Sequence, residues 1–94
     1  MVETKVKVLR SVSHPVRLLI VELLAEEDRT AHDFVLYFGS DFATVHKHLN
    51  ILMQARIIAS RKENKKVVYS LEMKCISNVL KCIEGLILDK KLDI

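Results

Sequence analysis

A tight turn at Gly39, placed between two helical patterns, most constrains how this chain can fold. Thr30, with Asp33 three residues later, is a capping-box signature at the start of AHDFVLYF. Gly39 suits the left-handed residue that ends a helix. Asp41 suits the cap of a following helix, which we expect from Phe42 to about Gln54. A helix, a tight turn and a second helix of this size predict a helix-turn-helix.

The segments on either side of this unit complete a mainly helical fold. Apolar residues at helical spacing predict a helix over residues 2–12, and Ser13 or His14 can cap another that begins at Pro15. After Arg56 two β-branched runs flank the polar turn ENKK, which predicts a β-hairpin. A last helix is expected over about residues 73–90. The predicted fold is therefore mainly α with a two-stranded β-hairpin wing, in the order α-α-α-α-β-β-α.

The length of the chain predicts one domain, residues 1–94, with a small core. The last helix nevertheless carries two neighbouring apolar stripes, too many for a small domain to bury alone. One stripe has heptad-type spacing, and the first helix offers apolar residues that can extend it. We expect a homodimer in which residues 1–12 and 73–92 are the dimerisation helices. The predicted interface residues are Val6, Leu9, Cys75, Val79, Cys82 and Leu86.

Charge is unevenly distributed along the chain. Residues 14–41 contain two basic and six acidic residues, whereas residues 42–71 contain six basic residues and a single acidic one, Glu63. A surface that binds a polyanion would therefore be concentrated in the second block. A solvated charged face is the alternative interpretation.

The helix from Phe42 to Gln54 has one apolar face and one polar face. Val45, Leu49 and Leu52 share the apolar face, which we expect in the core. The opposite face bears hydrogen-bond donors that can contact base edges in the major groove or phosphates of the backbone. The alternative is an ordinary amphipathic surface helix. The adjoining hairpin can lay cations along the backbone. The predicted DNA-binding residues are Ala43, Thr44, His46, Lys47 and Asn50 on the helix and Arg61, Lys62, Lys65 and Lys66 on the wing.

Three motifs stand in order along residues 10–71. They are the Pro15–Arg17 helix start, the TV-x-x-HL block beginning at Thr44, and the hairpin that closes in VVYSL. In this order and spacing the chain resembles the ArsR-type winged helix-turn-helix repressors. The resemblance implies a sequence-specific, DNA-binding transcriptional regulator: a homodimer on a roughly palindromic operator, released by a metal, an oxidant or another signal.

The chain departs from the family pattern at several positions. Phe42 replaces the polar residue that many relatives place at a base-reading position; it could contact a thymine methyl, but we expect it to lean into the core. Arg56 stands where a glycine commonly follows the recognition helix. Thr30 and His32 occupy the positions of the Cys-x-Cys pair of many metal sensors, so that type of metal site is absent. The last helix has no histidine and the four histidines are scattered along the chain, so neither a metal nor a cofactor is expected.

The two cysteines leave two interpretations open. Cys75 and Cys82 lie about 10 Å apart by helical rise, too far for a disulfide within one helix. Across a dimer they could form an intersubunit disulfide or a redox switch. Alternatively, they are free thiols that pack like small hydrophobic residues.

Other classes of function fit the sequence less well. A winged-helix module that binds proteins and never DNA would need another exposed patch, for which the acidic stretch Glu26–Asp28 is a candidate. No Ser/His/Asp or Cys/His set in the sequence has the turn context that activates a catalytic nucleophile, so we do not expect an enzyme. Without an apolar run long enough to cross a membrane or a signal-peptide pattern, we expect a cytoplasmic protein with no membrane partner.

Overall fold

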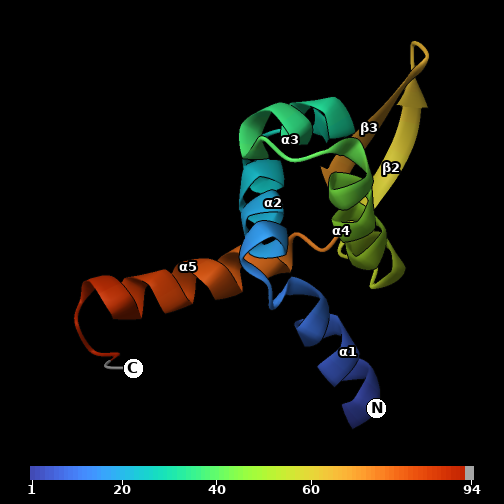
Figure 1. Cartoon of the computed structure of the whole chain (residues 1–94). Coiled ribbons are helices and arrows are strands. Elements are labelled where there is room, and N and C mark those ends of the chain that lie inside the picture. Colours follow the sequence, from blue (N-terminus) through green and yellow to red (C-terminus); the bar gives the residue numbers. More distant parts are fainter. Residues whose placement is uncertain (93–94) are drawn as a thin grey trace.

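The computed structural model describes residues 1–92, so positions 93 and 94 of the predicted domain lie outside the described residues. The helices α2, α3 and α4 pack with a small sheet, while α1 and α5 extend from this body in different directions (Figure 1). The elements are α1 (Val2–Val12), α2 (Pro15–Glu26), β1 (Arg29–Thr30), α3 (Ala31–Phe38), α4 (Phe42–Gln54), β2 (Ile58–Glu63), β3 (Lys66–Leu71) and α5 (Cys75–Leu88). This arrangement confirms the predicted winged helix-turn-helix fold.

The helices of the helix-turn-helix have the predicted capping residues. Thr30 Oγ1 accepts a hydrogen bond from the Asp33 N–H at 3.2 Å, and Asp33 Oδ2 accepts one from the Thr30 N–H at 2.8 Å. Gly39 has a φ of 65° at the end of α3. Asp41 Oδ1 then accepts from the Thr44 N–H at 3.1 Å and begins α4. Local contacts therefore set the start and the end of α3 and the start of α4.

The cap of α2 is His14 rather than Ser13. His14 Nδ1 accepts a hydrogen bond from the Val16 N–H at 3.1 Å. The Ser13 hydroxyl instead donates to the Leu9 carbonyl of α1. The histidine ring is thereby held between the end of α1 and the start of α2.

The wing is a β-hairpin, as predicted, but the sheet has a further strand that the sequence did not predict. Asn64 and Lys65 both have positive φ angles, 50° and 68°, as a two-residue hairpin turn requires. The two-residue strand β1 pairs with β3, so the described sheet has the order β1-β3-β2. A strand of two residues has no alternation to detect, and its pairing depends on how α2 and α3 are placed.

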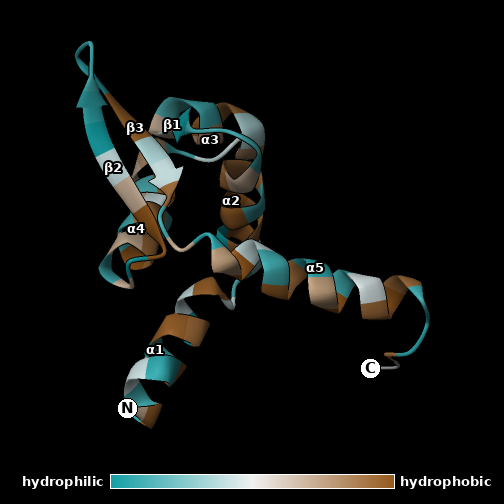
Figure 2. Cartoon of the chain, turned by 180° about the vertical axis from the view of Figure 1, so that it is seen from behind, coloured by the Kyte–Doolittle hydropathy of each residue, from teal (hydrophilic) through white to brown (hydrophobic). Residues whose placement is uncertain are grey.

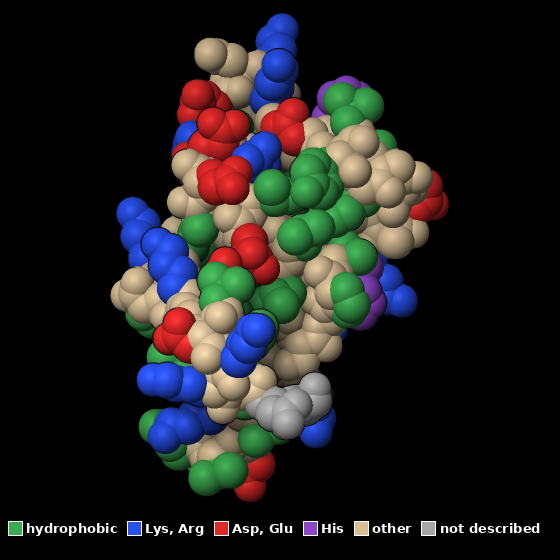
Figure 3. Space-filling view, turned by 90° about the vertical axis from the view of Figure 1, so that its left-hand side faces the viewer, with side chains coloured by type: hydrophobic (Ala, Val, Ile, Leu, Met, Phe, Trp, Pro, Cys, Tyr) green, Lys and Arg blue, Asp and Glu red, His purple; other side chains and the backbone are tan. Residues whose placement is uncertain are grey.

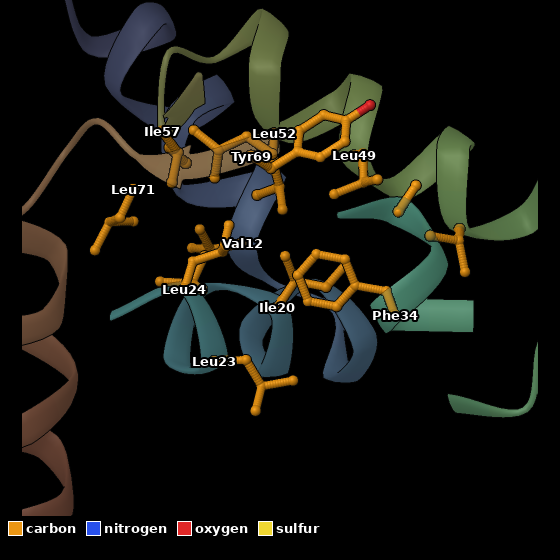
Figure 4. Close-up of a cluster of buried hydrophobic side chains, with 14 of the residues drawn as sticks. Val12, Ile20, Leu23, Leu24, Phe34, Leu49, Leu52, Ile57, Tyr69 and Leu71 are labelled. Carbon is orange, nitrogen blue, oxygen red and sulfur yellow. The ribbon is translucent and has the colours of Figure 1, made fainter. Parts of the chain in front are cut away.

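The core forms where α2, α3 and α4 meet the base of the sheet (Figure 4). Val45, Leu49 and Leu52 are buried, as their helical spacing predicted. Around them lie side chains from every neighbouring element. The largest of these fully buried partners are Ile20, Val21, Phe34, Ile57 and Ile58. Each such side chain contributes about 1.5–3 kcal/mol by leaving water, so α4 is firmly held by one face.

The two extended helices carry apolar residues along their length (Figure 2), and several of these residues are exposed. On α5, Ile76 is buried and Leu80 packs against the core, whereas Val79 and Leu86 are exposed. Leu9 on α1 is 57% exposed. The stripe that contains Ile76 and Leu80 serves the fold of this chain only at its start, because Ile83 and Ile87 farther along it are 43% and 53% exposed. The other stripe remains uncovered in the single chain.

None of the helices in residues 1–92 is long and apolar enough to cross a membrane.

Arg56, just after α4, carries backbone strain that glycine would relieve. Its φ is 60°, and its side chain makes only an exposed ion pair with Glu72 at 3.5 Å. We expect Arg56→Gly to raise the free energy of unfolding, measured by urea titration, by up to about 1 kcal/mol. Arg56→Ala, which keeps a Cβ but removes the ion pair, is the control. Equal stability of the two variants would contradict the strain at this position.

Candidate nucleic-acid interface

The face of α4 opposite the core is open to solvent. Ala43, Thr44, Lys47 and Asn50 are exposed, and His46 is partly buried. The buried positions of α4 determine this orientation, because a helix held by one face must turn the other outward. The predicted helix residues therefore form one continuous surface of small, hydrogen-bonding or cationic side chains.

Phe42 also belongs to this surface, and the expectation that it leans into the core is wrong. Its side chain is 55% exposed, and its ring centroid lies 4.8 Å from that of His46. Helical side chains tilt toward the N-terminus, so the first residue of α4 reaches past the buried stripe. The helical wheel placed Phe42 at the margin of the core but could not show that the core ends before it.

The lysines of the wing point into solvent. Lys62, Lys65 and Lys66 are exposed, and within residues 1–92 they form no ion pair. Figure 3 shows Lys and Arg side chains at the top of the molecule, where the wing ends. Exposed cations of this kind are suited to phosphate groups.

Arg61 differs from the neighbouring lysines. Its guanidinium lies 2.8 Å from Asp28 and 3.0 Å from Glu63, and the hydrogen bonds to these two carboxylates raise the pKa of Arg61. Side chains alternate along β2, so Arg61 projects from the other face of the hairpin than Lys62. Arg61 therefore connects the wing to the segment between α2 and β1.

Two hollows border the exposed face of α4. On the wing side, Phe42 and His46 face Lys66, Val67 and Tyr69 across the first hollow. Burial raises the pKa of the Tyr69 hydroxyl there. This hollow connects the start of α4 to the wing in one surface.

The second hollow lies on the side of α1 and α2, toward the C-terminal end of α4. Its lining includes Lys7, Arg10, Arg17, Ile51 and Gln54. The sequence pattern did not connect these cations with α4. The helical wheel places Gln54 in line with Lys47 and Asn50, which is a local signal, but the approach of α1 to α4 depends on tertiary packing.

A cluster of His14, Arg17 and His48 joins the start of α2 to α4. The two imidazole centroids are 4.6 Å apart, and Arg17 Nη1 lies 3.3 Å from His48 Nδ1. Burial first, and then the nearby His14, Arg17 and Lys47, lower the pKa of His48. His48 is therefore neutral at pH 7, and its Nδ1 can accept from Arg17. The Pro15–Arg17 helix start and the TV-x-x-HL block, two of the motifs singled out in the sequence, are therefore in contact.

The cysteines and the other histidines form no metal site among the described residues. Cys75 and Cys82 are free and exposed on α5. No group of three His, Cys, Asp or Glu side chains within residues 1–92 could hold a metal ion.

Comparison with known proteins places this geometry in a family. Residues 14–60, half of the chain, match the family described as bacterial regulatory proteins of the arsR family. The transcriptional repressor SdpR of Bacillus subtilis is 36% identical over 64 residues, which cover 68% of this chain and 71% of SdpR. The chain belongs to the ArsR family of winged helix-turn-helix transcriptional regulators.

Solved structures share the fold over nearly the whole chain. The crystal structure of Rv0081 from Mycobacterium tuberculosis has a TM-score of 0.81 at 24% identity, covering 96% of this chain and 95% of Rv0081. The homodimeric winged helix-turn-helix DNA-binding domain of Mb0332 from Mycobacterium bovis has a TM-score of 0.83 at 17% identity, covering 95% and 82%. Because the sequence identities are below 25%, these two structures show only that the fold is shared.

The lowered pKa of His48 predicts that stability falls in mild acid. The unfolded chain binds a proton near pH 6.5, whereas the folded chain binds it only at lower pH. The stability is therefore complete above pH 6.5 and falls as the pH drops through the folded pKa. We expect the free energy of unfolding to decrease between pH 7.5 and about pH 5.5, and to decrease less in His48→Gln.

Exposed His32 provides the control, as His32→Gln. Capping hydrogen bonds to Thr30 and Thr44, respectively, lower the pKa values of Asp33 and Asp41 below 3.8, so these carboxylates do not titrate in this range. Equal pH dependence of His48→Gln and the wild-type chain would show that His48 is not responsible.

Proposed function

We propose that this protein represses transcription as a homodimer that places α4 in the major groove of double-stranded DNA and the wing on the backbone. The observation that carries the proposal is the outward face of α4, with Lys47 and Asn50, beside the exposed lysines of the wing. SdpR, a relative at 36% identity, is a transcriptional repressor. A regulatory rather than a catalytic role follows, and DNA as the target implies the bacterial cytoplasm.

The helix and the wing divide the recognition of DNA between them. Asn50 can make paired hydrogen bonds with adenine, and Lys47 can reach guanine edges or phosphates. Ala43 and Thr44 let the helix approach closely, and His46 adds a further polar group at the margin. Lys62, Lys65 and Lys66 neutralise phosphates and contribute affinity that does not depend on sequence.

Dimerisation uses α1 and α5, within residues 1–12 and 73–92. The exposed apolar side chains Val6, Leu9, Val79 and Leu86 would be covered by a second copy, as large exposed apolar patches usually are. The DNA-binding domain of Mb0332, which has this fold, is homodimeric. The exposed Cys75 and Cys82 lie on the same helix and would enter the interface, either as free thiols or as an intersubunit disulfide.

The acidic stretch considered for a protein-binding module is not free. Arg29 pairs with Glu26 at 3.1 Å and lies 3.8 Å from Glu27, and Arg61 pairs with Asp28. These ion pairs favour the DNA-binding role over the alternative.

Reversal of two charges at the wing tip tests the backbone contact. We expect the double variant Lys65→Glu/Lys66→Glu to bind a random-sequence duplex at least about tenfold more weakly, because repulsion replaces attraction to phosphates. The control, Lys81→Glu/Lys91→Glu, makes the same change in net charge away from the wing. Equal affinity of the two variants in a fluorescence-anisotropy titration would remove the wing from the interface.

Phe42 is proposed to contact the methyl group of a thymine, since an exposed aromatic ring on this face cannot make paired hydrogen bonds with a base edge. The preferred operator is first enriched from a random pool. Replacing the contacted thymine by deoxyuridine, which lacks the methyl group, should weaken wild-type binding by about 0.8 kcal/mol per methyl group. Phe42→Ala should bind thymine and deoxyuridine operators equally. Retained discrimination in Phe42→Ala would assign the thymine to another residue.

A charge in the exposed stripe of α5 tests the dimer. Val79→Asp should shift the solution mass in reductant, measured by sedimentation, from dimer to monomer, because burial of an unpaired carboxylate is unfavourable. Asn78→Asp changes an exposed neighbour on another face of α5 and should remain dimeric. A wild-type chain that is dimeric only without reductant would mean that a disulfide alone joins the copies.

A further inference from the structure

A cationic hollow lies between α1, α2 and the C-terminal half of α4. Lys7 and Arg10 of α1 and Arg17 of α2 surround it, and Ile51, Gln54 and Ala55 of α4 form its other wall. Within residues 1–92, no Asp or Glu lines it. Figures 1 and 2 both show one end of α1 beneath the lower end of α4. Three positive groups from two helices therefore meet at one edge of the proposed reading surface.

We propose that this hollow binds backbone phosphates of DNA, on the strand opposite the one that the wing contacts. The inference rests on the proposed function and extends it to residues that lie outside the helix-turn-helix and the wing.

The placement of the two hollows supports this assignment. Phe42 and His46 mark the edge of α4 that faces the wing, whereas Ile51 and Gln54 mark the edge that faces α1 and α2. A helix in the major groove, which is about 12 Å wide, has a sugar-phosphate backbone on each side. With the wing lysines at one side, the cations of α1 and α2 lie where the second backbone passes.

The charges around the hollow are uncompensated. Among the described residues, Lys7, Arg10 and Arg17 form no ion pair with a carboxylate. The partly buried Arg17 donates to the Ser11 carbonyl and contacts His48, and both of these partners are neutral. The remaining N–H groups of its guanidinium stay available for an anion, and arginine matches the geometry of a phosphate well.

Dimerisation through α1 leaves this hollow open. On a helical wheel, Lys7 lies about 130° and Arg10 about 70° around α1 from the centre of the stripe formed by Val2, Val6 and Leu9. A partner on that stripe covers a different side of α1. The same helix can then hold the second subunit and the DNA backbone, which would fix the spacing of the two α4 helices along the duplex.

The dependence of DNA binding on salt tests the proposal. Affinity of the full chain for a random-sequence duplex of about 30 base pairs is measured at several salt concentrations, for wild type, Lys7→Gln/Arg10→Gln and the charge-matched control Lys81→Gln/Lys91→Gln. Removing the cation from one phosphate should reduce the slope of log K against log salt by about 0.9, so removing four cations from a dimer would reduce it by up to about 3.6. Sedimentation confirms that each variant has the wild-type mass.

The outcomes separate the inference from the proposed function. A slope for Lys7→Gln/Arg10→Gln equal to that of the control, with wild type binding DNA normally, would overturn the phosphate site alone. Absence of salt-dependent binding by wild type would overturn the proposed function itself. A thermal-shift titration with inorganic phosphate, without DNA, distinguishes the source of the anion. Stabilisation that disappears in Lys7→Gln/Arg10→Gln, together with an unchanged DNA slope, would identify a free-anion site and overturn the backbone assignment.

Discussion

Val45, Leu49 and Leu52 are almost completely buried against α2, α3 and the base of the sheet, and their burial determines which way α4 faces. A helix pinned by three consecutive turns cannot rotate without exposing apolar surface, at a cost of about 1.5–3 kcal/mol for each such side chain. The opposite face is therefore held toward solvent. The proposed recognition of DNA depends on this constraint, because Lys47 and Asn50 can meet base edges only while the core holds the helix.

Polar and ionic contacts then set the position of the elements around α4. The capping box at Thr30 begins α3, the left-handed Gly39 ends it, and the cap at Asp41 begins α4, so the bounds of both helices are set by local contacts. The Arg61–Asp28 pair connects β2 to the segment between α2 and β1, whereas the lysines of the wing form no ion pair among the described residues. Among the described residues, His14, Arg17 and His48 connect α2 to α4 without a carboxylate, and we expect protonation of His48 to weaken this contact. The proposed interface therefore combines elements that these contacts hold in place with cations at its edges that form no ion pair among the described residues.

Much of the fold could be predicted from the sequence, because its signals are local. The caps at Thr30 and Asp41, the left-handed Gly39, the hairpin turn at Asn64 and the buried stripe of α4 each depend on residues within one or two turns. The third strand could not be found in this way, since β1 has two residues and exists only through its pairing with β3. Phe42 was misplaced for a similar reason: where a core ends depends on which neighbours fill it.

The sequence by itself determined the order of the elements, the apolar face of α4 and the presence of a basic wing, because helical and strand periodicity are properties of neighbouring residues. Only the tertiary structure decided which cations remain free. It paired Arg61 with Asp28, 33 residues away, and brought Lys7 and Arg10 beside Gln54. Coulomb interactions act over a few ångströms in space regardless of separation along the chain, so charge pairing follows from packing rather than from sequence pattern.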